Sequence, residues 1–181
     1  MESMTLSWLA GQLLGLTALT LCVAAFASRR DDRLMVLLIS ANVAFALHFL
    51  CFGSTTAAAL TALIVLRICL ARRYKGSVAV MAALLMASAA AAALTWQSPL
   101  DLLPLTAAVL GTIGMFLLRG IPMRLLLAAA ALAWTLNNIL IGSIGGTLAE
   151  LLVLATNLVT MLRLAREREA APAGALREAR S

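Results

Sequence analysis

Charged residues are scarce in this sequence. Only 12% of its 181 residues are Asp, Glu, Lys or Arg, whereas 63% are hydrophobic. A soluble domain of this length has more surface to solvate than so few charged side chains can cover. The composition therefore excludes a soluble fold and indicates a protein whose solvent is the lipid bilayer.

The residue types that carry catalysis or bind metals are also nearly absent. The sequence has a single His, and its Cys residues, Cys22, Cys51 and Cys69, show no paired spacing. This pattern supports neither a disulfide framework nor a zinc site. There is no HExxH motif, no nucleophile with a matching base and no Gly-rich phosphate loop. We therefore expect no enzyme activity, no catalytic residues, no cofactor and no metal.

Long apolar runs are what the sequence has in abundance. A helix crosses the bilayer with ~20 mainly apolar residues. Seven such runs, separated by short turns, are predicted at about 6–27, 34–52, 55–71, 77–96, 100–118, 125–141 and 147–164. We expect the first run to be a retained helix, because residues 1–5 carry no positive charge and the run is longer than that of a signal peptide.

The basic residues all fall on one side of these seven runs. All 14 Lys and Arg lie in the turns after the first, third and fifth runs, at Arg67 near the end of the third run, or between the end of the seventh run and the C-terminus. By the positive-inside rule, the N-terminus lies outside and the C-terminus lies in the cytoplasm. The net charge of +6 therefore indicates orientation, and we expect no nucleic-acid binding.

The second and sixth runs share a pattern. Placing His48 on Asn137 brings Phe45 opposite Trp134, and both runs end in Gly-Ser at the outer side. Runs one to three and five to seven also have the same orientation, with the fourth run inverting the chain between them. The predicted fold class is all-α transmembrane, with seven helices in a 3+1+3 parallel-repeat arrangement. Repeat one covers about 6–73, the linker helix 77–96 and repeat two about 100–166. They lie within one transmembrane domain (1–168), which a cytoplasmic tail (169–181) follows.

Polar side chains inside the runs are the best pointers to function, because they are costly in lipid. The predicted substrate pathway comprises Asn42, His48, Trp134, Asn137, Asn138, Glu150 and Asn157. At ~1.5 Å per residue, Asn42, Trp134 and Asn157 fall near the midplane. The other four fall in the outer third. The alternative is that the Asn side chains bridge helices as packing contacts.

Three of the polar residues allow two interpretations each. Glu150 is either a protonatable coupling site or an acid favoured by the first turn of a helix. His48 is either titratable or a hydrogen-bonded packing residue. Arg67 either extends to the cytoplasmic interface or acts as an inner gate.

Small residues and turns complete the local predictions. Gly11 and Gly15 form a GxxxG pair, which indicates close helix packing, and Gly111 and Gly114 give the fifth run a similar face. Asp101 is expected to be a helix-start acid. The glycines of the segment 142–146 predict a tight, flexible turn.

The segment Asn138-x3-Gly142-Ser-Ile-Gly-Gly-Thr147, followed by Glu150 and preceded by Trp134, resembles the YgjV family of bacterial inner-membrane proteins. The segments His48-Phe-x3-Gly53 and Leu102-Leu-Pro104 resemble it too, as does the basic turn after the first run. The resemblance covers nearly the whole chain and implies a location in the bacterial inner (plasma) membrane.

The 3+1+3 plan is in turn similar to SWEET and PQ-loop transporters, which move small solutes by alternating access. That resemblance implies a small-solute transporter in which Asn157 matches the Asn that binds substrate in the third helix of each repeat. The third run has no Asn, and its nearest polar counterpart is Arg67.

The prediction is therefore a transporter of a small polar solute in the lipid bilayer, acting as a monomer or homodimer. Asn157, Trp134 and Asn42 would line a midplane pocket, and His48, Asn138 and Glu150 an outer entrance. The alternative is a non-transporting membrane scaffold or sensor. It predicts no water-accessible cavity between runs one to three and runs five to seven.

Overall fold

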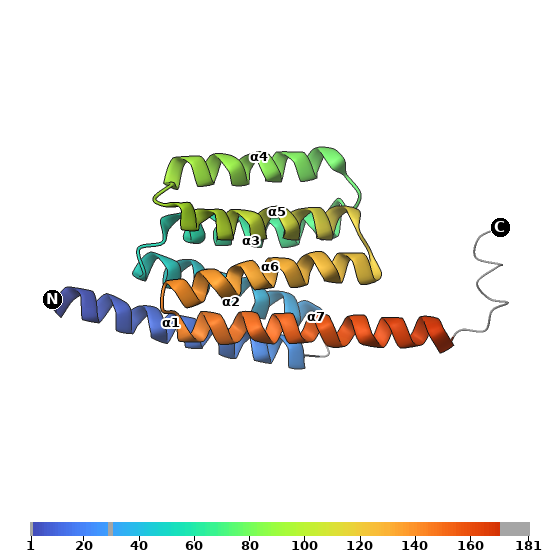
Figure 1. The fold of residues 1–181 in the computed structure, drawn as a ribbon, viewed down its shortest axis with the longest axis horizontal. Helices are drawn as coiled ribbons and strands as arrows, with labels where there is room; N and C mark the ends of the chain where they lie inside the picture. Colours follow the sequence, from blue (N-terminus) through green and yellow to red (C-terminus); the bar gives the residue numbers. More distant parts are fainter. Residues whose placement is uncertain (1, 29–30, 171–181) are drawn as a thin grey trace.

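The computed structural model describes residues 2–28 and 31–170. Seven α-helices occupy this part of the chain, with a short 3-10 helix η1 (Pro99–Asp101) before the fifth (Figure 1). Their bounds are α1 (Glu2–Ala27), α2 (Asp31–Cys51), α3 (Thr55–Arg73), α4 (Val78–Thr95), α5 (Leu102–Leu117), α6 (Gly120–Leu140) and α7 (Ile144–Ala170). The predicted all-α fold with seven helices is confirmed.

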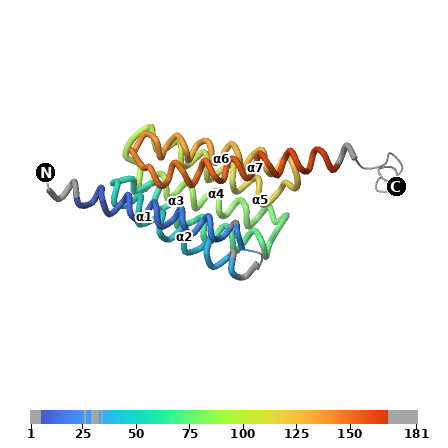
Figure 2. The backbone as a smooth tube through the Cα atoms, turned by 90° about the horizontal axis from the view of Figure 1, so that it is seen from below, coloured from blue at the N-terminus to red at the C-terminus, as the bar shows by residue number. Residues whose placement is uncertain are grey.

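Six of the seven helices are long and apolar enough to cross a membrane. The remaining helix, α2, has a shorter apolar part, Met35–Cys51, because it begins with charged residues at 31–33. It nevertheless packs between α1 and α3, and all seven helices extend along the long axis of the bundle (Figure 1, Figure 2).

Six of the helices form a closed ring. Neighbouring contacts run from α1 through α2, α3, α5, α6 and α7, and α7 then packs back against α1. The Ala-rich helix α4 lies outside this ring, against α3 and α5, at the edge of the bundle (Figure 1). Its Thr95 carbonyl accepts a 2.7 Å hydrogen bond from the Thr56 hydroxyl of α3. Among the described helices, the ring therefore contains every one except α4.

The two ends of the bundle differ in charge. The turn after α3, the turn after α5 and the last turns of α7 all lie at one end, which we call the basic end. The turns α2–α3, α4–α5 and α6–α7 lie at the other end and carry no Lys or Arg. At that end Asp101 caps η1, because its carboxylate accepts the backbone N–H groups of Gln97 and Ser98 at 2.7 and 3.0 Å. Its predicted role as a helix-start acid is confirmed.

The start of α7 differs from the prediction. Gly145 and Gly146 are helical and buried, so the flexible turn predicted over 142–146 is wrong for these two residues. The helix begins early because its free N–H groups are satisfied: the Ser143 hydroxyl accepts from Gly146 N–H at 3.0 Å. The carboxamide of Gln12, on α1, accepts from Ile144 N–H at 3.1 Å and donates to the Gly142 carbonyl at 2.7 Å.

Close contact between α1 and α7 closes the ring. A Cβ atom built on Gly145 would collide with the backbone of Gly15, and one built on Gly11 would lie 2.5 Å from the Phe52 ring of the α2–α3 turn. The close packing predicted for Gly11 and Gly15 is therefore confirmed, and it allows backbones to approach where larger residues cannot.

We predict that Gly145→Ala destabilises the protein, because its methyl group has to displace backbone atoms of α1. Overpacking of this kind costs about 1–3 kcal/mol, so the thermal denaturation midpoint in detergent should fall by several degrees. Leu148→Ala, on an exposed face one turn further along α7, is the matched control. Equal midpoints for the two variants would show that the α1–α7 contact does not hold the ring together.

Candidate functional site

A cavity of about 150 Å³ lies inside the ring, and all six ring helices contribute to its wall. Its polar lining residues are Asn42 of α2, Arg67 of α3, Trp134 of α6 and Glu150 of α7. Most of the rest of the wall is small or aliphatic, with Cys22 of α1 and Gly111 of α5 among it. An apolar void stays dry, whereas a polar one of this size holds water or a solute.

Arg67 points into the ring instead of toward the basic end. Its guanidinium packs against Gly111, where a Cβ would lie 2.5 Å from Nη1, and Nη1 donates to the Ala108 carbonyl at 3.3 Å. Ala108 lies further from the basic end of α5 at Leu117 than Arg67 does from the basic end of α3 at Arg73, whereas Gly111 lies level with Arg67. The interpretation in which Arg67 extends to the membrane interface is therefore wrong. Gly111 leaves the space that makes the inward conformation possible.

Glu150 lies on the opposite wall of the same cavity. Because α7 begins at Ile144, Glu150 stands in the second turn, and its interpretation as a first-turn acid is wrong. Its carboxylate accepts no hydrogen bond from the residues that the structure describes. Arg67 and Glu150 both face this cavity. The cavity thus brings together one positive and one negative group, from different halves of the chain.

Aromatic rings bound the cavity on the side away from the basic end. Phe45 and Trp134 line it there, and the Phe49 ring stacks on Trp134 with centroids 5.3 Å apart. Asn42 and Trp134, both predicted near the midplane, line this cavity together. The Asn42 amide donates to the Leu38 carbonyl at 2.8 Å, which leaves its oxygen as an acceptor.

His48 and Asn138 are buried in the helix packing and are not part of the cavity wall. The His48 ring donates from Nδ1 to the Gly11 carbonyl at 2.7 Å and contacts the Phe52 ring with centroids 4.8 Å apart. The Asn138 amide donates to the Trp134 carbonyl at 2.9 Å. Both side chains are therefore packing residues of the bundle and do not line an open entrance. Asn137 is buried as well and lies outside the wall.

Asn157 also lies outside the cavity wall. Its side-chain oxygen accepts a 3.2 Å hydrogen bond from the Arg124 guanidinium of α6, and its amide donates to the Val153 carbonyl at 2.9 Å. The predicted midplane pocket therefore does not include Asn157. Asn157 instead serves as a hydrogen-bond acceptor for Arg124, near the start of α6.

Sequence reasoning missed two residues that shape this region. Gln12 joins α1 to the α6–α7 turn, and Cys22 contributes α1 to the cavity wall. A Gln inside an apolar run is as costly as an Asn, so its position in the first run was a usable signal. Nothing in the sequence marks Cys22. In the described part of the chain, no cluster of His, Cys, Asp and Glu could hold a metal ion.

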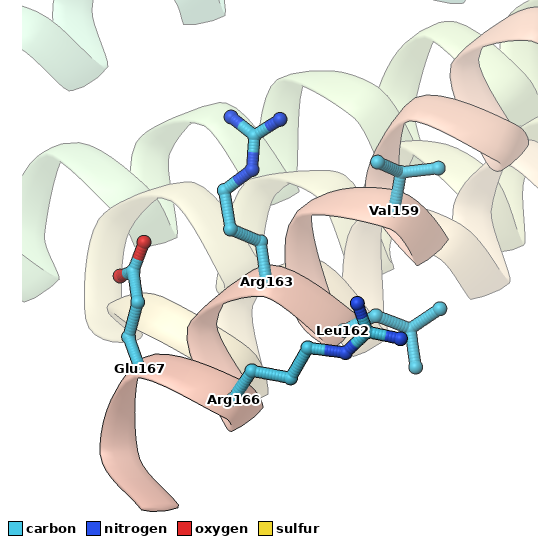
Figure 3. A pocket seen from close by; sticks show the side chains of 5 residues that line it. All are labelled: Val159, Leu162, Arg163, Arg166 and Glu167. Atoms are coloured by element: carbon cyan, nitrogen blue, oxygen red, sulfur yellow. The ribbon is translucent and has the colours of Figure 1, made fainter. Parts of the chain in front are cut away.

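A second hollow lies on the surface of α7 near the basic end. It is lined by Val159, Leu162, Arg163, Arg166 and Glu167, all from this one helix (Figure 3). With only one helix in its wall, it does not resemble an enclosed binding site.

Comparison with known proteins identifies the family. Residues 9–168 match Imp-YgjV, described as a bacterial inner membrane protein. The chain belongs to the YgjV family. This YgjV-family protein is 28% identical over 163 residues to the inner membrane protein YgjV of Escherichia coli (strain K12), which is 90% of this chain and 88% of that relative. No solved structure matches it. The predicted resemblance is confirmed, and the protein is a multi-pass protein of the bacterial inner membrane.

We predict that Arg67 and Glu150 are energetically coupled. Either Arg67→Gln or Glu150→Gln leaves one charge without its partner in the membrane interior, which should cost about 3 kcal/mol. The double variant removes both charges and should be more stable than either single variant. Thermal denaturation of the YgjV-family protein in detergent measures this, with Arg163→Gln and Glu167→Gln, on α7 outside the cavity, as matched controls. Strictly additive effects would show that the two side chains do not interact.

Proposed function

We propose that this YgjV-family protein is a transporter of a small polar solute that works by alternating access. The observation that carries the proposal is the central cavity, which is lined by all six ring helices and holds Arg67, Glu150 and Asn42. Ionisable side chains are rare inside membrane helices and mark substrate or ion pathways.

The pattern of helix contacts supports a two-part mechanism. If α1–α3 is laid on α5–α7, the α1–α7 contact becomes the α5–α3 contact, and both contacts exist. This exchange is expected of two parallel repeats related by an axis along the bundle, with α4 as the linker. The two triplets, α1–α3 and α5–α7, then contact each other at two interfaces and can rotate about the site between them.

The ring residues have distinct roles in this proposal. Arg67 and Glu150, one from each triplet, bind the solute together with Asn42. Trp134, Phe45 and Phe49 close the cavity on the side away from the basic end. By the positive-inside rule the basic end faces the cytoplasm, so the aromatic group is the outer gate.

A second candidate is a scaffold or sensor that moves no solute. The observation in its favour is the length of α7, whose last turns extend beyond the other helices and present Arg163, Arg166 and Glu167 (Figure 1, Figure 3). In that account the partner binds this extension. Removing residues 163–181 would then abolish the cellular role, and substitutions in the cavity would not.

We predict that the purified protein in liposomes takes up at least one small polar solute from a panel of amino acids, polyols, amines and carboxylates. Glu150→Gln should reduce uptake by on the order of tenfold or more, because it removes a charge from the site. Glu167→Gln, on the same helix but outside the cavity, should retain normal uptake. If no solute moves, and the cellular phenotype depends only on the α7 extension, the scaffold is correct and the transporter is not.

A further inference from the structure

The charged side chains in the wall of the central cavity indicate the chemical class of the solute. We infer that the cavity binds a small zwitterion, with its carboxylate on Arg67 and its ammonium group on Glu150. This inference rests on the proposed transport function and goes beyond it by naming the two charges that the solute carries.

The balance of charge is the first argument. One guanidinium and one carboxylate line the cavity, so the empty site is formally neutral. An anion or a cation alone would leave a net charge inside the membrane, which is expensive. A zwitterion neutralises each side chain locally and leaves the total at zero. A neutral solute would leave both protein charges without a new partner.

Unused hydrogen-bonding capacity is the second argument. Arg67 donates one long bond of 3.3 Å, from Nη1 to Ala108, and its buried Nε has no partner among the described residues. The planar guanidinium therefore has donors left for a carboxylate, which it binds in two-pronged fashion. The Glu150 carboxylate accepts nothing from the described chain and remains free for an ammonium group.

The remaining wall favours a short solute with few hydroxyl groups. Apart from Asn42 and the Trp134 indole, that wall is formed mostly by Ala, Leu, Ile and Val side chains. A sugar would bury several hydroxyls there without partners, and each one costs free energy. By contrast, the rings of Phe45 and Trp134 beside the cavity suit an ammonium group through cation–π attraction. The volume of about 150 Å³ limits the solute to a few heavy atoms.

Binding of four small probes tests the inference. Glycine carries both charges, acetate only the carboxylate, methylammonium only the amine, and ethylene glycol neither. We expect glycine to stabilise the detergent-solubilised protein against heat most strongly and to bind on the order of tenfold more tightly than either singly charged probe. Arg67→Gln should abolish the advantage of glycine over methylammonium, and Glu150→Gln its advantage over acetate.

A variant that keeps both charges makes the result interpretable even if the charge-removing variants fail to fold. Gly111→Ala places a methyl group where the Arg67 guanidinium now lies, and that flexible end can move aside. It should fold and yet bind glycine on the order of tenfold more weakly, because the carboxylate contact is displaced. Gly114→Ala, on the same helix but against Leu126 of α6, is the matched control and should bind glycine normally.

The outcomes separate this inference from the transport proposal. If the protein binds and transports only singly charged or uncharged solutes, the transporter stands and the zwitterion is wrong. If glycine binds equally well to the wild type, Gly111→Ala and Arg67→Gln, the solute carboxylate does not bind Arg67 and the zwitterion inference is wrong. If no probe binds and no solute of the wider panel moves, both proposals fail.

Discussion

Two opposite charges that face one cavity inside a membrane bundle are the constraint on which the rest of the structure depends. A lone charge is costly at that depth, and Arg67 and Glu150 line the same cavity, where each can face the other or a ligand. They come from α3 and α7, which lie on opposite sides of the ring. In the transporter that we propose, movement of α1–α3 against α5–α7 would change the distance between the charges. A solute that bridges them would couple its own binding to that movement.

The ring has to be closed for such a cavity to exist, and the closure depends on small residues. Gly15 and Gly145 let α1 and α7 approach until their backbones touch, while Gln12 satisfies the exposed backbone groups of the α6–α7 turn. On the α5 side, Gly111 leaves room for the guanidinium of Arg67. These contacts join segments that lie far apart in the chain, and they bring the six ring helices around one cavity.

The fold was predictable because its signals are local, whereas much of the site was not. Long apolar runs and the position of basic turns were enough to predict seven helices, and the Gly11–Gly15 pair was enough to predict close packing. The inward direction of Arg67 depends on Gly111, and the pairing of Asn157 depends on Arg124. Such partners are distant in sequence, so depth along a helix could not separate cavity residues from packing residues. His48, Asn137 and Asn138 showed the same difficulty, since their depth was estimated but the helix face that would meet the cavity was not known.

The central claim is that a water-accessible polar cavity lies inside this bundle, and cysteine accessibility tests it directly. In a variant whose three Cys residues are replaced by Ala, Ala130→Cys places a thiol on the cavity wall and Leu132→Cys places one on an exposed apolar face of the same helix. The reaction rate with a small, water-soluble thiol reagent in intact membranes is then compared. The account predicts that the thiol at position 130 reacts readily and that the thiol at position 132 does not, because the lipid excludes the reagent. Equal resistance at both positions would contradict it.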